Sequence, residues 1–313
     1  MTVTVFIDGA VGTTGLDIRE RLGARDDLTV ATLAEDRRKD AAARAEALND
    51  ADIAILCLPD DAAREAIALI RNARTRVIDA STAHRVAEGW TYGFAELEPD
   101  QAARIAAARF VANPGCYPTA FLGLVRPLVR AGLIPSDWPL SFNAVSGYSG
   151  GGKGMIAEFE EGGTDTAFRP YAMGVAHKHL PEMRAHAGLA QPPIFAPAVA
   201  RLLRGMLGEV PLPLAHLPGK PTLANVETVL HEAYADTPLV TVAPGDVAAI
   251  AIEEHAGTDA MTLRVCGNAE TGQLRLVATL DNLGKGAGGA AVQNLNIMAG
   301  LDPLAGLVLP PKE

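Results

Sequence analysis

The chain has 313 residues, 49% of them hydrophobic, and a formal net charge of −10 from 37 acidic and 27 basic side chains. This length favours two domains or one large α/β unit with an ample core, and the acidic balance argues against broad nucleic-acid binding. No apolar run reaches membrane-spanning length and the first residues do not resemble a signal peptide, so we expect a cytoplasmic protein.

The three cysteines, Cys57, Cys116 and Cys266, lie far apart in unlike contexts. Their odd number and spacing predict neither a disulfide framework nor a zinc site. Cys57 and Cys266 fall in apolar, strand-like runs and are expected to be inert. Only Cys116 stands where chemistry is expected.

From residue 2 to about residue 111, short β-rich runs alternate with Ala- and Arg-rich helical stretches. The strands are predicted at 3–7, 28–32, 53–58, 77–79 and 110–112, and the helices at 15–22, 41–48, 60–71 and 99–107. Alternation of this kind predicts βαβ units and a doubly wound parallel sheet, the Rossmann arrangement.

A glycine-rich turn, Gly9-Ala10-Val11-Gly12-Thr13-Thr14-Gly15, follows the first strand and opens a helix. Glycines here let backbone N–H groups approach a pyrophosphate at the helix N-terminus. The spacing is G-x-x-G-x-x-G, a departure from G-x-G-x-x-G, and a purely structural turn is the alternative. We predict cofactor contacts from Gly9, Gly12, Thr13, Thr14 and Gly15.

The second strand is followed by Glu35-Asp36-Arg37-Arg38-Lys39. An acidic residue here would bind a ribose hydroxyl, whereas an Arg would neutralise a 2′-phosphate. Arg37 and Arg38 favour NADP as the cofactor, although a solvated charge run is the plainer alternative. After the fourth strand, Ser81 is expected beside the cofactor and Arg85 beside an anionic group of a substrate.

The block Asn113-Pro114-Gly115-Cys116-Tyr117-Pro118-Thr119 lies between a strand and a helix. A cysteine at a helix N-terminus meets the positive end of the macrodipole, which favours the nucleophilic thiolate. Proline suits the first helical turn, and Pro114-Gly115 makes a sharp approach that exposes the side chain. We therefore predict Cys116 to be a nucleophile rather than a buried structural cysteine.

A thiolate needs a proton-transfer partner, and His177-Lys178-His179 provides two candidates. In an extended segment both histidines point to the same side, before a helix that begins at Pro181. A metal-ligand pair is the alternative, but the sequence has no further ligand cluster with recognisable spacing. A Cys/His acid–base pair is the better interpretation, and it leaves open whether His177 or His179 carries the proton.

Beyond residue 113 we expect a helix at 118–131, strands at 141–145, 206–214, 261–267 and 274–280, and a last helix at 286–298. This is typical of an α+β domain with a largely antiparallel sheet. Its glycine-rich loop 147–154 places Ser149 and Lys153 as candidate substrate contacts. Asn282 and Gly284, where the last strand meets the last helix, would suit a nicotinamide amide, or else a tightly packed helix start.

Together, the blocks 9–15, 113–119, 177–182 and 281–296 resemble the N-acetyl-γ-glutamyl-phosphate reductase family, in its shorter variety. The resemblance implies an NADPH enzyme of arginine biosynthesis that makes N-acetylglutamate 5-semialdehyde and phosphate through a Cys116 thioester. It also implies an NADP-binding Rossmann domain over 1–115 and 285–313. A catalytic and oligomerisation domain of the semialdehyde dehydrogenase and glyceraldehyde-3-phosphate dehydrogenase type would cover 116–284, in a homodimer or homotetramer.

Two rival functions share these features. Another phosphorylating semialdehyde dehydrogenase, of the aspartate or aminoadipate type, would use the same chemistry and differ only in substrate. A regulatory protein that senses NADP without turnover would have no need for an activated Cys116.

Overall fold

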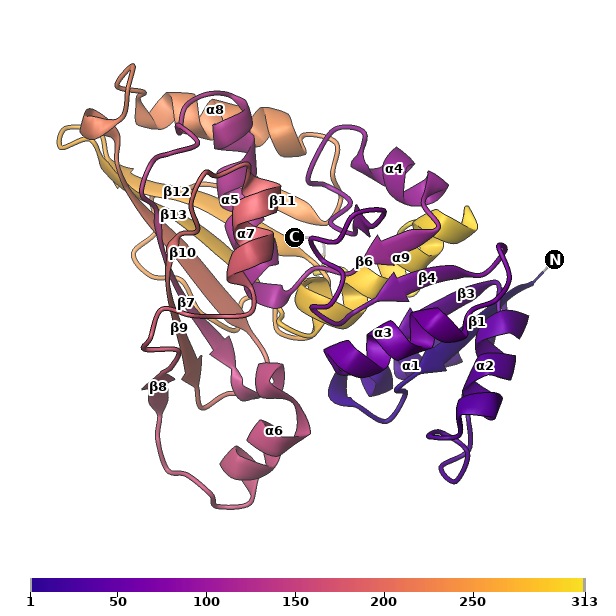
Figure 1. Cartoon of the computed structure of the whole chain (residues 1–313). Coiled ribbons are helices and arrows are strands. Elements are labelled where there is room, and N and C mark those ends of the chain that lie inside the picture. The colour runs from indigo at the N-terminus through magenta and orange to yellow at the C-terminus, as the bar shows by residue number, and fades with distance from the viewer. Residues whose placement is uncertain (1, 312–313) are drawn as a thin grey trace. The chain divides into compact units, whose positions relative to one another are not determined.

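The computed structural model describes residues 2–311, which form two compact units (Figure 1). Unit 1 comprises residues 2–115 and 287–307, and unit 2 comprises residues 116–286 and 308–311. The chain therefore leaves unit 1 directly before Cys116 and returns to it for its last helix.

Unit 1 is a six-stranded parallel sheet in the order β2-β1-β3-β4-β6-β5. Its strands are β1 (Val3–Asp8), β2 (Leu28–Ala31), β3 (Ile53–Leu56), β4 (Arg76–Asp79), β5 (Thr91–Tyr92) and β6 (Phe110–Ala112). Its helices are α1 (Thr13–Gly23), α2 (Ala41–Asp50), α3 (Asp60–Leu69), α4 (Gln101–Ala107) and α9 (Gly289–Ala299). The Rossmann prediction is confirmed.

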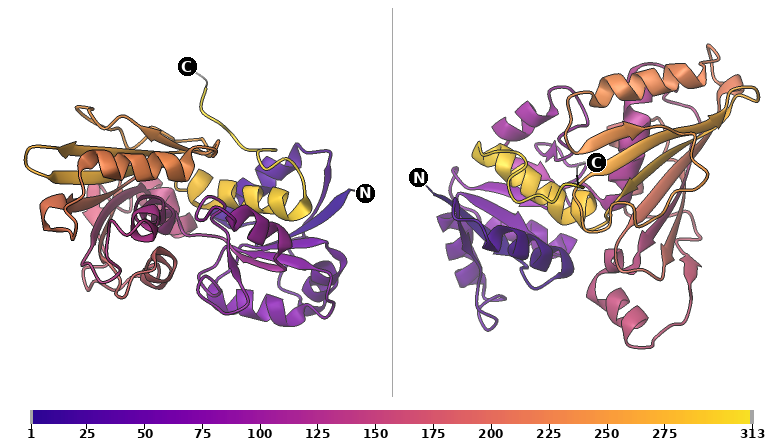
Figure 2. Two further views of the ribbon diagram at one scale, coloured as in Figure 1. Left: turned by 90° about the horizontal axis from the view of Figure 1, so that it is seen from above. Right: turned by 180° about the vertical axis from the view of Figure 1, so that it is seen from behind.

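Helices cover both faces of this sheet because alternate strand residues point to opposite sides. Val5, Ile7 and Ile55 pack against α1, α4 and α9, whereas Phe6 and Leu56 pack against α2 and α3. The last helix, yellow in Figure 2, thus belongs to the layer that also contains the first helix. All of these strand side chains are fully buried.

Unit 2 contains a seven-stranded mixed sheet in the order β11-β12-β13-β10-β7-β9-β8. Its strands are β7 (Ser141–Gly147), β8 (Phe168–Pro170), β9 (Ile194–Ala200), β10 (Met206–Pro213), β11 (Val240–Ala243), β12 (Met261–Asn268) and β13 (Gln273–Leu280). Its α-helices are α5 (Cys116–Arg130), α6 (Gly152–Glu160), α7 (Leu180–Ala187) and α8 (Leu223–Tyr234). Four of the pairings are antiparallel, as expected, and β7/β9 and β11/β12 are parallel.

Two helices lie against this sheet, and a third packs on one of them. Helix α5 contacts β10 and β13, α8 contacts β11 and β12, and α7 packs on α5. The helix predicted from residue 286 begins instead with a π-helical turn at Gly284–Gly288, and its α-helical part starts at Gly289. Gly286, inside this π-helical turn, lies against the predicted nucleophile Cys116.

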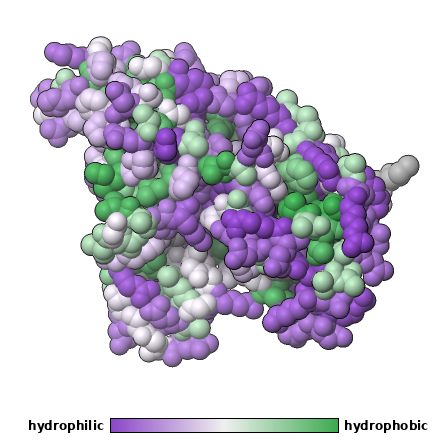
Figure 3. Space-filling view, viewed as in Figure 1, coloured by the Kyte–Doolittle hydropathy of each residue, from purple (hydrophilic) through white to green (hydrophobic). Residues whose placement is uncertain are grey.

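The face drawn in Figure 3 is mostly hydrophilic, with hydrophobic residues in small separate patches. Among the described residues, no helix is both long enough and apolar enough to cross a membrane. Most apolar side chains are buried inside the two units, and unit 1 has one hydrophobic cluster on each face of its sheet.

Candidate active site

Cys116 is the first residue of α5, and its side chain is partly exposed. The predicted helix therefore starts two residues earlier than Pro118. In this position the sulfur meets the positive end of the helix dipole and the first-turn backbone N–H groups, which have no partners within the helix. The structure thus places Cys116 at a helix start, which is the position that the sequence predicts for it.

The two predicted histidines lie close together in unit 2, beside the residue that follows the cysteine. The ring centroids of His177 and His179 are 4.7 Å apart, and those of Tyr117 and the two histidines are 6.2 and 6.1 Å apart. His179 is buried and precedes the first residue of α7. The structure therefore gathers the predicted cysteine block and histidine block on one side of unit 2.

The two imidazoles have different environments. Nδ1 of His177 accepts a hydrogen bond from the backbone N–H of His179 at 3.1 Å. Burial, reinforced by the neighbouring Lys178, lowers the pKa of His177 from 6.5 to about 4. At neutral pH the ring is therefore neutral, and because Nδ1 is an acceptor its proton lies on Nε2.

Two tyrosines complete the surroundings of the cysteine. The hydroxyl of Tyr117 donates to the carbonyl of Ala198 at 2.9 Å. Burial raises the pKa of Tyr117 well above its usual range and that of Tyr171 to about 12, and the nearby Cys116 raises both further. Both phenols therefore stay protonated. Sequence reasoning missed Tyr171, because nothing in the spacing of an isolated tyrosine marks it.

The glycine-rich loop of unit 2 places its two candidates differently. Ser149 is buried; its hydroxyl donates to the carbonyl of Leu203 at 2.5 Å and accepts from the side chain of Asn282 at 2.8 Å. The other side of the Asn282 amide accepts from the backbone N–H of Gly205 at 3.0 Å. Lys153, on α6, is exposed. Ser149 and Asn282 are therefore partners of each other.

In unit 1 the predicted dinucleotide loop has the backbone that such a turn requires. Gly9 has φ +88°, and a Cβ on Gly15 would lie 2.4 Å from the carbonyl oxygen of Gly9. Helix α1 begins at Thr13 after Gly12. Among residues 2–311, the buried hydroxyl of Thr13 has no hydrogen-bond partner. A bound phosphate group would satisfy both this hydroxyl and the helix N-terminus.

The basic cluster of unit 1 occupies a turn between β2 and α2. Arg37 lies 3.8 Å from Glu46, and Arg38 lies 3.4 Å from Glu35. Long, solvent-exposed ion pairs of this kind are weak, so both guanidinium groups can exchange these partners for an anion.

Ser81 and Arg85 follow β4 at the carboxyl end of the unit 1 sheet. Ser81 donates to the buried carboxylate of Asp79 through its backbone N–H and its hydroxyl, at 2.9 and 2.7 Å. Arg85 is buried and donates to the carbonyl groups of Asn113 and Ala80, at 3.0 and 3.1 Å. Arg85 thus joins the loops after β4 and β6, a function that its position in the sequence did not reveal.

Two family models match the chain: the NAD-binding domain of semialdehyde dehydrogenases over residues 4–105, and their dimerisation domain over residues 116–282. Solved structures share the fold. Aspartate semialdehyde dehydrogenase II of Vibrio cholerae, complexed with ASA, has a TM-score of 0.73 at 16% identity and covers 96% of this chain and 99% of that one. A probable aspartate-semialdehyde dehydrogenase of Pseudomonas aeruginosa has a TM-score of 0.73 at 18% identity, with the same coverage.

A doubly wound nucleotide domain joined to a mixed-sheet domain whose first residue is a helix-start cysteine is thus the semialdehyde dehydrogenase architecture. Two relatives are more specific. The N-acetyl-gamma-glutamyl-phosphate reductases of Brucella ovis and Brucella melitensis biotype 2 are 52% identical over 309 residues, which is 96% of this chain and 100% of each relative. The chain belongs to the N-acetyl-gamma-glutamyl-phosphate reductase family and is an oxidoreductase.

Proposed function

We propose that this enzyme uses NADPH to reduce N-acetyl-L-glutamyl 5-phosphate to N-acetyl-L-glutamate 5-semialdehyde and phosphate, a step of arginine biosynthesis. The observation that carries the proposal is Cys116 at the start of α5, with Tyr117 beside the rings of His177 and His179. The names of the relatives at 52% identity support the same substrate.

Cys116 supplies the covalent step. Its thiolate attacks the γ-acyl carbon, the bond from that carbon to the phosphate oxygen breaks, and phosphate leaves with the electron pair. Backbone N–H groups in the first turn of α5 stabilise the oxyanion of the tetrahedral intermediate. When bound, NADPH supplies the hydride that brings the acyl group to the oxidation level of an aldehyde. Release of the aldehyde regenerates the thiolate of Cys116.

We assign different roles to the two histidines. His177 accepts a hydrogen bond at Nδ1 and has a pKa of about 4, so at neutral pH it has only an Nε2–H group to offer. Such a ring donates a hydrogen bond to a substrate oxygen but is a poor proton carrier. His179 is therefore our candidate for the acid/base that moves the proton of the tetrahedral intermediate.

The residues of unit 1 fit NADP. The backbone at Gly9 and Gly15 and the hydroxyl of Thr13 would hold the pyrophosphate, together with Gly12 and Thr14. Arg37 and Arg38 would bind the 2′-phosphate, which separates NADP from NAD. Ser81, Asn282 and Gly284 complete the proposed cofactor set.

Three residues are proposed for the substrate. Arg85 and Lys153 carry the positive charge that suits its phosphate and carboxylate groups, and Ser149 carries a hydroxyl. Lys153 has the more accessible cation, because it is exposed whereas Arg85 donates to two backbone carbonyls.

The two units suggest separate domains for cofactor binding and for catalysis. We propose residues 1–115 and 285–313 as the NADP-binding domain and residues 116–284 as the catalytic and oligomerisation domain.

No disulfide joins the cysteines among residues 2–311, which suits a reducing compartment such as the cytoplasm.

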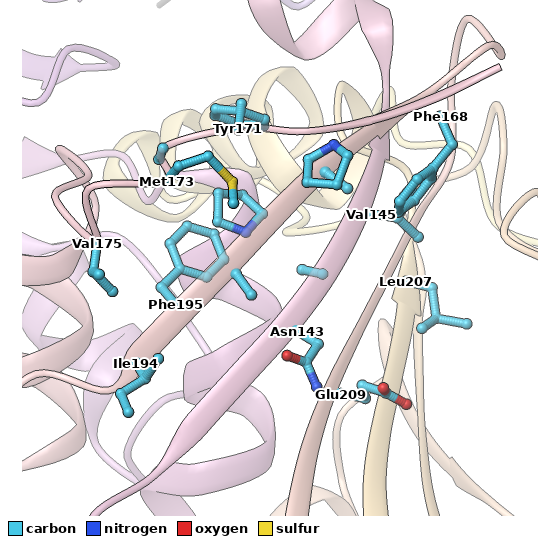
Figure 4. Close-up of a pocket in the computed structure, with 16 residues that line it drawn as sticks. Asn143, Val145, Phe168, Tyr171, Met173, Val175, Ile194, Phe195, Leu207 and Glu209 are labelled. Atoms are coloured by element: carbon cyan, nitrogen blue, oxygen red, sulfur yellow. The ribbon is translucent and has the colours of Figure 1, made fainter. Parts of the chain in front are cut away.

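Unit 2 also carries an apolar groove of about 500 Å³, formed by β7, β9, β10 and the segment 168–175 (Figure 4). Phe168, Met173 and Ile194 line it and are 56%, 81% and 63% exposed. Apolar side chains this exposed are typical of a surface that another protein covers. We propose that a second copy of the chain covers it, in a homodimer or homotetramer, and the match to a dimerisation domain supports this occupant.

The reverse reaction tests the substrate. Purified enzyme receives NADP, phosphate and either N-acetylglutamate semialdehyde or aspartate semialdehyde, and the absorbance of reduced cofactor is followed. We expect NADP to be reduced only when N-acetylglutamate semialdehyde is the substrate. Faster reduction with aspartate semialdehyde would assign the enzyme to the rival substrate class.

A further inference from the structure

We infer that the turn Asp281–Gly286 sets the position of the Cys116 sulfur, and that Gly286 is the residue of this turn that contacts the cysteine. The inference depends on the proposed role of Cys116 as nucleophile. It gives a function to the block around residues 281–286, which the sequence suggested for nicotinamide. It makes Gly286 and Asp281 positioning residues of this enzyme.

The first observation is a close approach between backbones. A Cβ atom on Gly286 would lie 2.8 Å from Cβ of Cys116 and 3.2 Å from its Cα. It would also lie 3.0 Å from the carbonyl oxygen of Asp281. These cysteine atoms belong to the start of α5 and cannot rotate away as the end of a long side chain could. Only glycine therefore allows the turn to lie this close to the nucleophile.

The second observation is the shape of the turn. The backbone N–H of Gly286 donates to the carbonyl of Asp281 at 2.9 Å, which closes a π-helical turn. Turns of this kind are rare and occur frequently at functional sites. This wide turn brings Gly286, rather than a residue with a side chain, against Cys116.

The third observation is the buried carboxylate that fixes the turn. Asp281 directly follows β13 and is fully buried. Its Oδ1 accepts from the backbone N–H groups of Leu283 and Gly284, at 2.7 and 3.2 Å. Its Oδ2 accepts from the N–H of Gly257 at 2.6 Å and lies 2.9 Å from Nε of Arg204. The turn is thus fixed to the sheet of unit 2 through β13, and to the two loops that contain Gly257 and Arg204.

These contacts connect the sheet to the nucleophile. Asp281 directly follows strand β13, its carboxylate accepts hydrogen bonds from the turn, and Gly286 at the end of the turn contacts Cys116. A methyl group at residue 286 must displace either the turn or the first residue of α5. Because catalysis depends on placement to within about 1 Å, this displacement should lower kcat on the order of 100-fold.

The test is Gly286→Ala with Gly245→Ala as matched control. A Cβ on Gly245 would lie 1.9 Å from the carbonyl of Val265, so the control has a backbone clash of its own, against β12 of the same unit. Two readouts are compared in folded protein: steady-state kcat and KM, and the rate of Cys116 alkylation by iodoacetamide against pH. Peptide mass spectrometry assigns the alkylation to Cys116 and separates it from Cys57 and Cys266.

We expect Gly286→Ala to lose kcat, with KM for NADPH unchanged within about twofold, and to shift the pH midpoint of Cys116 alkylation. Gly245→Ala should keep the wild-type alkylation profile. A Gly286→Ala enzyme whose kcat and alkylation profile match those of the control would overturn the inference. If wild-type enzyme lacks reductase activity, the proposed function fails, whereas the alkylation profiles still decide whether the turn positions the sulfur.

If Gly286→Ala does not fold, Asp281→Asn replaces it. The asparagine keeps the volume and an oxygen for Leu283 and Gly284, but its amide group no longer accepts from Gly257 or pairs with Arg204. We expect a drop in kcat of about 10-fold and a shifted alkylation profile. A folded Asp281→Asn enzyme with a wild-type alkylation profile would refute the positioning role.

Discussion

Replacement of His177 by asparagine should make the enzyme less sensitive to acid. Burial lowers the pKa of His177 from 6.5 to about 4 in the folded state. Above pH 6.5 the imidazole is neutral whether the chain is folded or unfolded, so it contributes nothing. As the pH falls towards about 4, the unfolded chain takes up a proton that the folded chain does not, and the free energy of unfolding decreases.

The size of this effect follows from the two pKa values. The two values differ by about 2.5, and each pKa unit corresponds to about 1.4 kcal/mol. The free energy of unfolding therefore decreases by about 3 kcal/mol once the pH is below both values. Solvent that reaches the partly exposed ring reduces the expected loss to about 2 kcal/mol. Asparagine offers an oxygen where Nδ1 of His177 accepts from His179, so the backbone there should keep its hydrogen bond.

Urea unfolding gives the free energy of unfolding at each pH between about pH 7 and about pH 4.5. The effect appears as a difference between wild type and variant in the slope of this free energy against pH. Wild-type enzyme should lose about 2 kcal/mol more than His177→Asn across this range. His231→Asn, which replaces an exposed histidine on α8, is the matched control. Equal slopes for wild type and His177→Asn would refute the assignment of a half-buried neutral imidazole at residue 177.

Four further outcomes are expected. Cys116→Ser should bind NADPH, by fluorescence titration, but lose turnover; substantial residual reductase activity would contradict the thioester. His179→Asn should lower kcat by about 100-fold or more, and a smaller loss than in His177→Asn would reverse the two roles. Arg37→Ala should raise KM for NADPH more than for NADH, and equal increases would remove Arg37 from the 2′-phosphate site. Tyr117→Phe loses its hydrogen bond to Ala198 and should lower the free energy of unfolding by about 1 kcal/mol, measured in urea.

Local patterns were sufficient to predict unit 1 except for its two-residue edge strand β5, which is too short to show a period. Its strands are short apolar runs separated by helices, and the parallel sheet follows from that alternation. Unit 2 was harder because several of its elements lack a clear period. Strand β9 contains Pro197, and β8 is only three residues long. Helix α8 was missed although Thr222 and Asn225 form a capping box, because asparagine replaces the usual Glu or Gln of that motif.

The candidate site was predictable where a residue acts through its own neighbours in the chain. Cys116 needs only a helix start, and the turn residues before it mark that start. Asn282 and Arg85 were different, because their partners are distant in sequence: Ser149 lies 133 residues from Asn282, and Asn113 lies 28 residues from Arg85. The residue types revealed hydrogen-bonding capacity, but only the fold shows which groups use it.

The two histidines show how much one hydrogen bond decides. In the sequence His177 and His179 are equivalent, because alternate residues of an extended segment share a side. In the structure the N–H of His179 donates to Nδ1 of His177, so the later histidine fixes the tautomer of the earlier one. A proton at Nε2 and a pKa of about 4 then leave His177 as a hydrogen-bond donor at neutral pH. We therefore propose His179 as the proton carrier, for a physical reason that the spacing of the motif does not contain.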